Sequence, residues 1–178
     1  RFGVAFTQNL SAEGIENEAG EIVSFEPNGI DFAEFMVAPN PGEGLKPLVK
    51  IASGGETARL MLAIKNELAK ADDTPTLIFD EIDQGIGGRV GAVVGQKLWQ
   101  LAKSHQVLCI THLASIAVRA DNHMKVEKLL SDSRRITTVR RLENEERIKE
   151  IARMLSGDTN RGVSLIHAKE MLAEFQNV

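Results

Sequence analysis

Hydrophobic and polar residues alternate along the first part of the chain with the period of β-strands. Three stretches carry this alternation: 1–8 (RFGVAFTQ), 21–27 (EIVSFEP) and 29–39 (GIDFAEFMVAP). A turn at Asn28-Gly29 separates the last two stretches, and a loop containing glycine and proline follows over 40–47. The pattern therefore predicts a β-rich segment over the first 50 residues or so.

Beyond this segment, helical spacing alternates with short apolar runs. Helices are predicted from Ser53, where Glu56 completes a capping-box pattern, and over 89–103, 113–120, 143–156 and 163–175. The runs at 76–79 and 106–111 are typical of buried parallel strands, and 124–142 is typical of a hairpin. We therefore predict an α/β fold, with a mostly parallel sheet flanked by helices and a β-rich N-terminal segment, in a single domain over 1–178.

Composition narrows the classes of function. Hydrophobic residues make up 43% of the chain and charged residues 26%, as in soluble globular domains, and no apolar stretch reaches membrane-spanning length. The net charge of -4 argues against a whole-domain electrostatic grip on nucleic acid but allows a local basic patch. The predicted hairpin carries such a basic patch, made of Arg134, Arg135, Arg140 and Arg141. It could contact a DNA backbone, but we favour the interpretation that it is a solvated face.

Two further features bear on the setting of the protein. The lone cysteine, Cys109, lies in an apolar run and has no partner for an internal disulfide, which fits a reducing, cytoplasmic compartment. The sequence starts at Arg1 and enters directly into strand-like sequence, so we interpret the chain as a fragment of a longer protein.

Groups suited to phosphate chemistry stand at the carboxyl ends of both predicted parallel strands, where α/β sheets bind ligands. Asp80 and Glu81 end the first strand, and His112 follows the second. An aspartate here suits Mg²⁺, a neighbouring glutamate can polarise a water that attacks a phosphoryl group, and an imidazole can hydrogen-bond a phosphate oxygen. Each also has a plainer interpretation, with the acidic pair as the start of a loop and His112 as a structural hydrogen-bonding residue.

The helix that starts near Ser53 offers a second phosphate site. Backbone N–H groups at a helix start, made accessible by Gly54 and Gly55, can bind phosphate, although the same residues can serve only as a helix cap. The phosphate-loop pattern G-x-x-x-x-G-K-[ST] is absent, because the stretch from Gly91 to Lys97 has the wrong spacing and falls within a predicted helix.

In this order, the elements resemble the second half of an ATP-binding-cassette ATPase head. "SGGE" resembles the signature motif, "TLIFDE" the Walker B strand, "IDQGIGG" the D-loop and "THLASIA" the switch-histidine region. Three stretches are similar in sequence to the RecN family of bacterial DNA repair proteins: "NPGEGLKPLVKIASGGE", "PTLIFDEIDQGIGGRVGAVVGQKLWQLA" and "HQVLCITHLASIA". This resemblance runs over 29–172.

The resemblance implies the C-terminal lobe of a chromosome-maintenance-type ATPase head that acts in DNA double-strand break repair and recombination. Two such heads sandwich two ATP molecules, and hydrolysis depends on Mg²⁺. It implies an ATP-binding set of Ser53, Gly54, Gly55, Glu56 and Asp83, in which the first three hold a partner's γ-phosphate. It further implies that Asp80 holds Mg²⁺, that Glu81 orients or deprotonates the attacking water, that His112 senses the γ-phosphate, and that Asp83 lies at the interface between heads.

The partners implied are a second head in a homodimer, the N-terminal Walker A lobe of the same protein, and DNA, in the bacterial cytoplasm near the nucleoid and without a membrane. Because the Walker A lobe and the coiled coil are absent from this chain, we expect the chain alone to be inactive. Two rivals stay open. One is a head-like interaction module without ATP turnover, which Glu81 and His112 disfavour. The other is a transporter nucleotide-binding half, which "DEIDQG" in place of "DEPT" disfavours.

Overall fold

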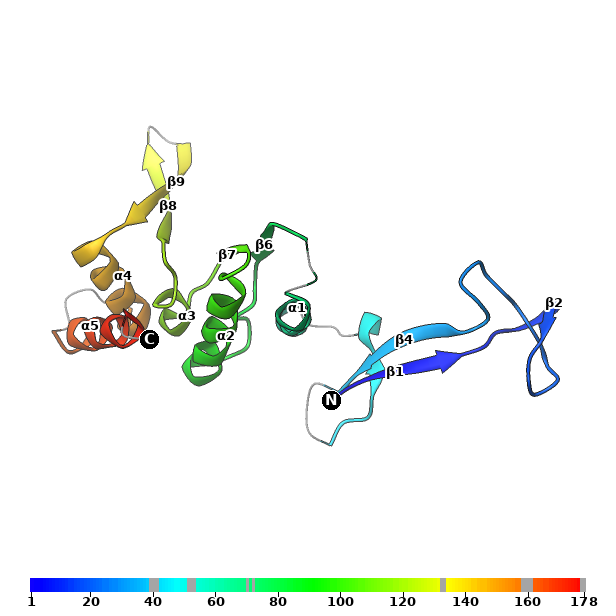
Figure 1. Ribbon diagram of the computed structural model, residues 1–178. Coiled ribbons are helices and arrows are strands. Elements are labelled where there is room, and N and C mark those ends of the chain that lie inside the picture. Colours follow the sequence, from blue (N-terminus) through cyan, green and yellow to red (C-terminus); the bar gives the residue numbers. More distant parts are fainter. Residues whose placement is uncertain are drawn as a thin grey trace. The chain divides into compact units, whose positions relative to one another are not determined.

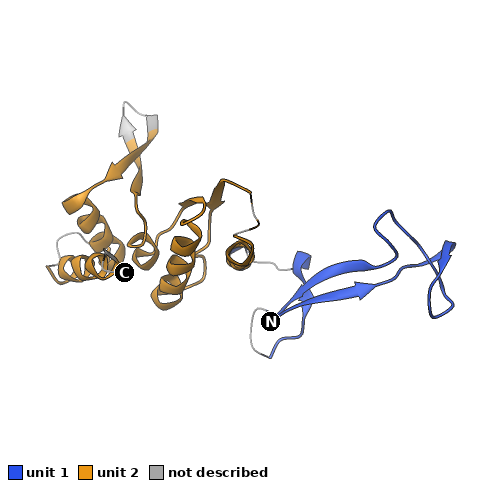
Figure 2. Cartoon of the chain, in the orientation of Figure 1, with its two compact units in different colours: residues 1–56 blue, residues 57–178 orange. Residues whose placement is uncertain are grey.

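The computed structural model describes residues 1–38, 42–50, 54–69, 71, 73–131, 134–157 and 162–176. Strands and helices are both present, which confirms the α/β class (Figure 1). Contacts divide the chain into two compact units, Arg1–Glu56 and Thr57–Val178, and each is described here by itself (Figure 2). The single domain expected over 1–178 stays a prediction.

The first unit is built from short antiparallel strands. They are β1 (Phe2–Thr7), β2 (Leu10–Glu16), β3 (Ile22–Val23), β4 (Phe32–Val37) and β5 (Lys46–Pro47), followed by a 3-10 helix over Leu48–Lys50. The order β1-β4-β5 forms one sheet, and β2 pairs with β3 in another. The β-rich prediction is confirmed, but β2 was not predicted, and β5 lies where a loop was expected.

The second unit is organised around the one parallel strand pair among the described residues. β6 (Thr76–Phe79) pairs with β7 (Gln106–Cys109), with Phe79 opposite Cys109. Helices α1 (Gly54–Leu68) and α2 (Gly88–Leu101) contribute to its core. The buried members of that core are Leu62, Leu77, Phe79, Ile82, Val94, Leu98, Leu101 and Ile116.

The sheet differs from the mostly parallel one that we expected. Only β6 and β7 run parallel, and every other described strand pair is antiparallel. The exposed fractions are 69% for Ile78, 50% for Leu108 and 61% for Ile110, so the face of the β6–β7 pair that carries them is open. We expected fully buried strands because parallel sheets are normally covered on both faces. In the structure, β6 and β7 are buried on one face only.

The C-terminal part contains a hairpin and three helices, close to the predicted bounds. β8 (His123–Ser131) and β9 (Arg134–Leu142) form the hairpin, which rises away from the helices in Figure 1. The helices are α3 (Ala114–Ala117), α4 (Asn144–Ser156) and α5 (Gly162–Gln176). Gly157 ends α4 in the left-handed conformation, with φ of 72°, as a C-terminal glycine cap does.

Ion pairs tie the base of the hairpin to α4. Lys125 Nζ lies 2.7 Å from a Glu127 oxygen and 3.0 Å from an oxygen of the buried Glu150, and Arg140 pairs with Glu146 at 2.9 Å. The positive charge of Arg140 is therefore matched within the chain, which supports a structural role for it. Among the described residues, no helix is long and apolar enough to cross a membrane.

Candidate functional site

The parallel pairing of β6 with β7 brings the two sets of predicted site residues to one edge of the sheet. Asp80 and Glu81 follow β6, and Thr111 and His112 follow β7. The pairing continues one step beyond the strands, because the backbone N–H of Ile110 donates to the carbonyl of Phe79 at 2.9 Å. Ligands bind outside this end of parallel sheets.

Asp80 and Glu81 lie in a turn that opens directly after β6. The backbone N–H of Glu81 donates to Asp80 Oδ1 at 2.9 Å, and the Glu81 carbonyl accepts from the N–H of Gln84 at 3.0 Å. Glu81 has a φ of 56°, in the left-handed region that a glutamate seldom adopts. The side chains of both acidic residues are exposed. A strained backbone at such a position is typical of functional sites.

Asp83 is the most deeply buried of the predicted site residues in this turn, at 4% exposure. Its Oδ2 atom accepts from the Thr111 hydroxyl at 2.6 Å and from the backbone N–H of His112 at 2.7 Å, and it lies 2.9 Å from His112 Nδ1. Burial raises the pKa of the Asp83 carboxyl, but the hydrogen bonds from Thr111 and His112 and the nearby imidazole outweigh it, so the pKa lies below its usual value.

The side chain of His112 is 72% exposed, and its Nδ1 atom lies beside the Asp83 carboxylate. The sequence indicated that His112 and the acidic pair share a sheet edge, and the strand pairing confirms it. The sequence did not indicate the direct link between Asp83 and His112. The motif resemblance implied that Asp83 lies at an interface between heads, which stays a prediction, and within the chain its carboxylate accepts from Thr111 and His112.

Sequence reasoning missed Thr111 and Arg59. Thr111 connects the turn to the next segment, because its hydroxyl donates to Asp83 and accepts from the N–H of Leu113 at 3.0 Å. Arg59 lies on α1, and its guanidinium donates to the carbonyls of Ile82 at 3.1 Å and Gln84 at 3.0 Å. Thr111 could have been noticed as a hydroxyl beside His112, but nothing in the spacing of Arg59 signalled its two bonds.

The predicted phosphate-binding helix start is only partly described. Ser53 lies outside the described residues, while Gly54 is exposed, Gly55 is buried and Glu56 is half-buried in the first turn of α1. The stretch from Gly91 to Lys97 is helical, as predicted. Gly91 and Gly95 are buried there, where α2 approaches α3: a Cβ added at Gly95 would lie 3.1 Å from the Ser115 carbonyl oxygen.

Asp80 has the chemistry of a magnesium ligand. Its carboxylate is exposed beyond the strand end, and within the described part of the chain Oδ1 accepts one hydrogen bond, from the adjacent Glu81 N–H. Among the described residues, no three His, Cys, Asp or Glu side chains gather as a self-sufficient metal site. The residues present therefore fit Mg²⁺ held by one carboxylate, water and substrate phosphates, which is the usual manner for this ion.

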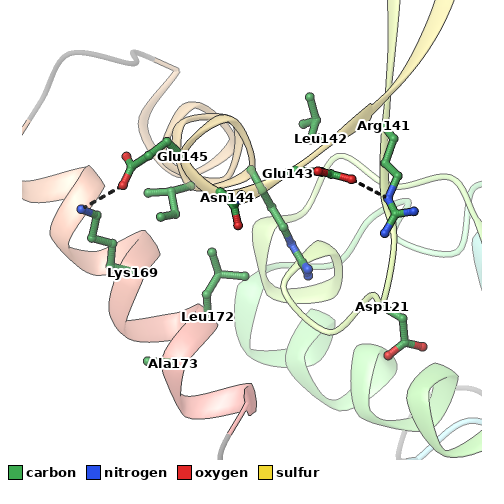
Figure 3. A pocket seen from close by; sticks show the side chains of 11 residues that line it. Asp121, Arg141, Leu142, Glu143, Asn144, Glu145, Lys169, Leu172 and Ala173 are labelled. Atoms are coloured by element: carbon green, nitrogen blue, oxygen red, sulfur yellow. Dashed lines mark ion pairs between the residues drawn. The ribbon is translucent and has the colours of Figure 1, made fainter.

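Of two cavities in the second unit, one adjoins the site and the other lies elsewhere. One of about 300 Å³ adjoins the site, since it is lined by Asp80 with β6 and by Ala58, Met61 and Lys65 of α1. Another of about 650 Å³ lies between α4, α5 and the base of the hairpin (Figure 3). It contains none of the strand-end residues, and its rim charges pair with each other, as Lys169 with Glu145 at 3.6 Å and Arg141 with Glu143 at 3.5 Å.

Comparison with known proteins identifies close relatives. No protein-family model matches the chain. It is 52% identical over 150 residues to the DNA repair protein RecN of Deinococcus radiodurans, and 49% identical over 146 residues to that of Treponema pallidum. The matches cover 83% and 82% of this chain. The RecN of Streptomyces coelicolor is 41% identical over 172 residues, which is 97% of this chain. The chain spans only 26% to 30% of the length of these relatives.

One solved structure supports the fold. It is the Smc head domain with an extended coiled coil, bound to the C-terminal domain of ScpA, derived from Pyrococcus furiosus. Its TM-score is 0.50 at 21% sequence identity, and the match covers 98% of this chain and 34% of that one. At this level of identity, the likeness concerns the fold alone.

Proposed function

Identity of 41–52% over most of its length places this chain in the RecN family, and we propose that it is the C-terminal ATPase lobe of a protein that repairs DNA double-strand breaks. The proposed activity is Mg²⁺-dependent ATP hydrolysis coupled to the holding of DNA. The observation that carries it is the meeting of Asp80, Glu81 and His112 at the carboxyl edge of one parallel strand pair.

The roles of these three residues follow from their surroundings. Asp80 would hold Mg²⁺, which neutralises charge on the phosphate oxygens. Glu81 carries an exposed carboxylate on a backbone held in the left-handed region, and it would orient or deprotonate the attacking water. The exposed imidazole of His112 would contact the terminal phosphate.

We propose that a second head completes the site. Gly54, Gly55 and Glu56 form the first turn of α1, where backbone N–H groups and the helix dipole attract anions, and Ser53 precedes them. This helix start would contact ATP held by the Walker A loop of an opposing head, in a homodimer with two shared nucleotides.

The open face of the β6–β7 pair supports a further partner, the Walker A lobe of the same protein. Ile78, Leu108 and Ile110 are exposed there, and parallel strands are stable when both faces are covered. Burying these three side chains would contribute roughly 1–2 kcal/mol each to the association. On this account the chain by itself does not hydrolyse ATP, and the complete protein works on DNA in the bacterial cytoplasm, at the nucleoid.

The proposal is tested in a full-length protein. In what we call the RecN chimera, the D. radiodurans RecN carries the sequence of this chain in place of its matching segment. Glu81→Gln should abolish ATP hydrolysis but leave ATP-dependent dimers, measured by light scattering, because the amide has the shape of the carboxylate but cannot act as a base. Glu145→Gln, on the exposed side of α4, is the control. Hydrolysis at the unsubstituted rate in Glu81→Gln would remove Glu81 from the proposed role.

A further inference from the structure

A single carboxylate oxygen holds the segment that follows β7. Asp83 Oδ2 meets three groups within 3 Å: the Thr111 hydroxyl, the backbone N–H of His112 and His112 Nδ1. Asp83 is itself anchored, because the preceding residue Ile82 is fully buried in the core. The turn after β6 thus determines the position of the histidine after β7.

The contact with Nδ1 has a chemical consequence for the imidazole. His112 Nδ1 lies 2.9 Å from Asp83 Oδ2. An ionised carboxylate only accepts hydrogen bonds and would repel a bare ring nitrogen at this distance, so the arrangement favours a proton on Nδ1. In a neutral ring this makes Nδ1 the donor and leaves Nε2 as a bare acceptor, and in a protonated ring Nε2 is a second donor. Because the side chain is 72% exposed, Nε2 is the nitrogen available to a ligand.

Burial strengthens this arrangement. Asp83 is almost inaccessible to water, and a buried carboxylate without donors would be strongly destabilised. The Thr111 hydroxyl and the His112 backbone N–H supply fixed donors, so the carboxylate stays ionised with the imidazole Nδ1 2.9 Å from the same oxygen. A buried carboxylate that orients an exposed imidazole through Nδ1 is also how Ser-His-Asp enzymes set the tautomer of their histidine.

We propose that Asp83 is a positioning residue for His112, which fixes Nδ1 as the bonded nitrogen and presents Nε2 to an anionic oxygen at the sheet edge. The identity of that oxygen as a nucleotide's terminal phosphate rests on the proposed function, whereas the link between the two side chains does not. In a protonated ring, Nε2 then donates to the phosphate while Nδ1 donates to Asp83. The positive charge of the ring thus lies between two negatively charged groups.

The link is tested first without nucleotide, in this chain labelled with ¹⁵N. Long-range proton–nitrogen correlations at about pH 9, where imidazoles are neutral, show which nitrogen carries the proton. His112 should be the Nδ1–H tautomer in the unsubstituted chain and should shift toward Nε2–H in Asp83→Asn. Thr111→Val, which removes another donor to the same oxygen, should leave the tautomer unchanged. The correlations of His123 serve as the internal control.

Two spectral results would overturn the proposal. One is an Nε2–H tautomer for His112 in the unsubstituted chain, which tests the link even if Asp83→Asn fails to fold. The other is an identical tautomer in the unsubstituted chain and Asp83→Asn.

The link to catalysis is tested in the RecN chimera by a double-mutant cycle. Asp83→Asn should lower kcat about ten- to a hundredfold with little change in the KM for ATP, because orientation is lost and binding is not. In His112→Ala the further change Asp83→Asn should cost nothing more. Additive losses would overturn the positioning role. If His112→Ala itself leaves kcat unchanged, the proposed phosphate contact of His112 fails, while the tautomer result stands by itself.

Discussion

Replacing Gly95 by alanine should destabilise the chain, although alanine is the better helix former. Gly95 is buried in α2 against α3, the short helix that follows His112. An added Cβ would lie 3.1 Å from the Ser115 carbonyl oxygen and 3.2 Å from the Ile116 Cα. Both are backbone atoms, which cannot rotate away, so α2 and α3 must separate slightly.

The magnitude follows from two opposing terms. Alanine gains about 1 kcal/mol in helix propensity over glycine. Forcing extra volume into a packed interface costs about 1–3 kcal/mol. The net effect for Gly95→Ala is a destabilisation of up to about 2 kcal/mol, whereas Gly88→Ala in the same helix meets no atom within 4 Å and keeps its gain. Gly91→Ala should fall between them, because its clashes are with the side-chain atoms Ser115 Oγ and Leu113 Cδ1.

The assay is urea unfolding of the three variants and the unsubstituted chain, followed by circular dichroism and compared at a common m-value. The midpoint of Gly95→Ala should be the lowest and that of Gly88→Ala the highest. Equal midpoints for Gly95→Ala and Gly88→Ala would refute the close approach of α2 to α3. The His112 correlations should also move in Gly95→Ala and stay in place in Gly88→Ala.

Three further predictions concern the turn and the base of the hairpin. Arg59→Met removes two hydrogen bonds to the carbonyls of Ile82 and Gln84 and should lower the free energy of unfolding, measured in urea, by about 2 kcal/mol. The control Arg89→Met, at an exposed position of α2, should be neutral, and equal stabilities of the two variants would contradict a stabilising role for Arg59. Glu81→Gly should relieve the left-handed strain and raise the free energy of unfolding by about 1 kcal/mol, while the RecN chimera loses ATP hydrolysis; a less stable variant would argue against strain. Burial raises the pKa of the Glu150 carboxyl, but the hydrogen bonds from Arg153 and Lys125 outweigh burial and hold this pKa below 4.5, so the ionised carboxylate stabilises the fold above pH 4.5 and this stabilisation is lost as the pH falls through the lowered pKa. Glu150→Gln should therefore be about 2 kcal/mol less stable than the unsubstituted chain at pH 7, and a stability difference that persists in acid would contradict the pairing.

Local patterns predicted the elements whose signals lie within them. The spacing of apolar residues indicated α2, α4 and the hairpin, and Gly157 marked the end of α4. β2 and β5 were missed for different reasons. β5 is two residues long and includes Pro47, which has no N–H to donate. β2 is exposed along almost its whole length, so no alternation of buried apolar residues marks it, and it approaches β3 closely where Gly14 lies against the Val23 carbonyl oxygen.

The candidate site was predictable in its membership and less so in its connections. The order of motifs along the chain indicated that Asp80, Glu81 and His112 share an edge, because parallel strands align their carboxyl ends. It did not reveal that Asp83 turns inward, since this depends on the turn after Glu81 and on the burial of Ile82. The partners of Arg59 are backbone carbonyls more than twenty residues away, and no residue type encodes them.

The most direct test of the central claim is ATP turnover per molecule in the RecN chimera as a function of protein concentration. Glu81→Gln and this chain alone are the controls. A shared site between two heads predicts turnover that rises with concentration and saturates as dimers form, with both controls inactive. Ser53→Arg should abolish the rise while ATP binding persists. Turnover that is independent of concentration in a protein shown by light scattering to be monomeric would contradict the shared site.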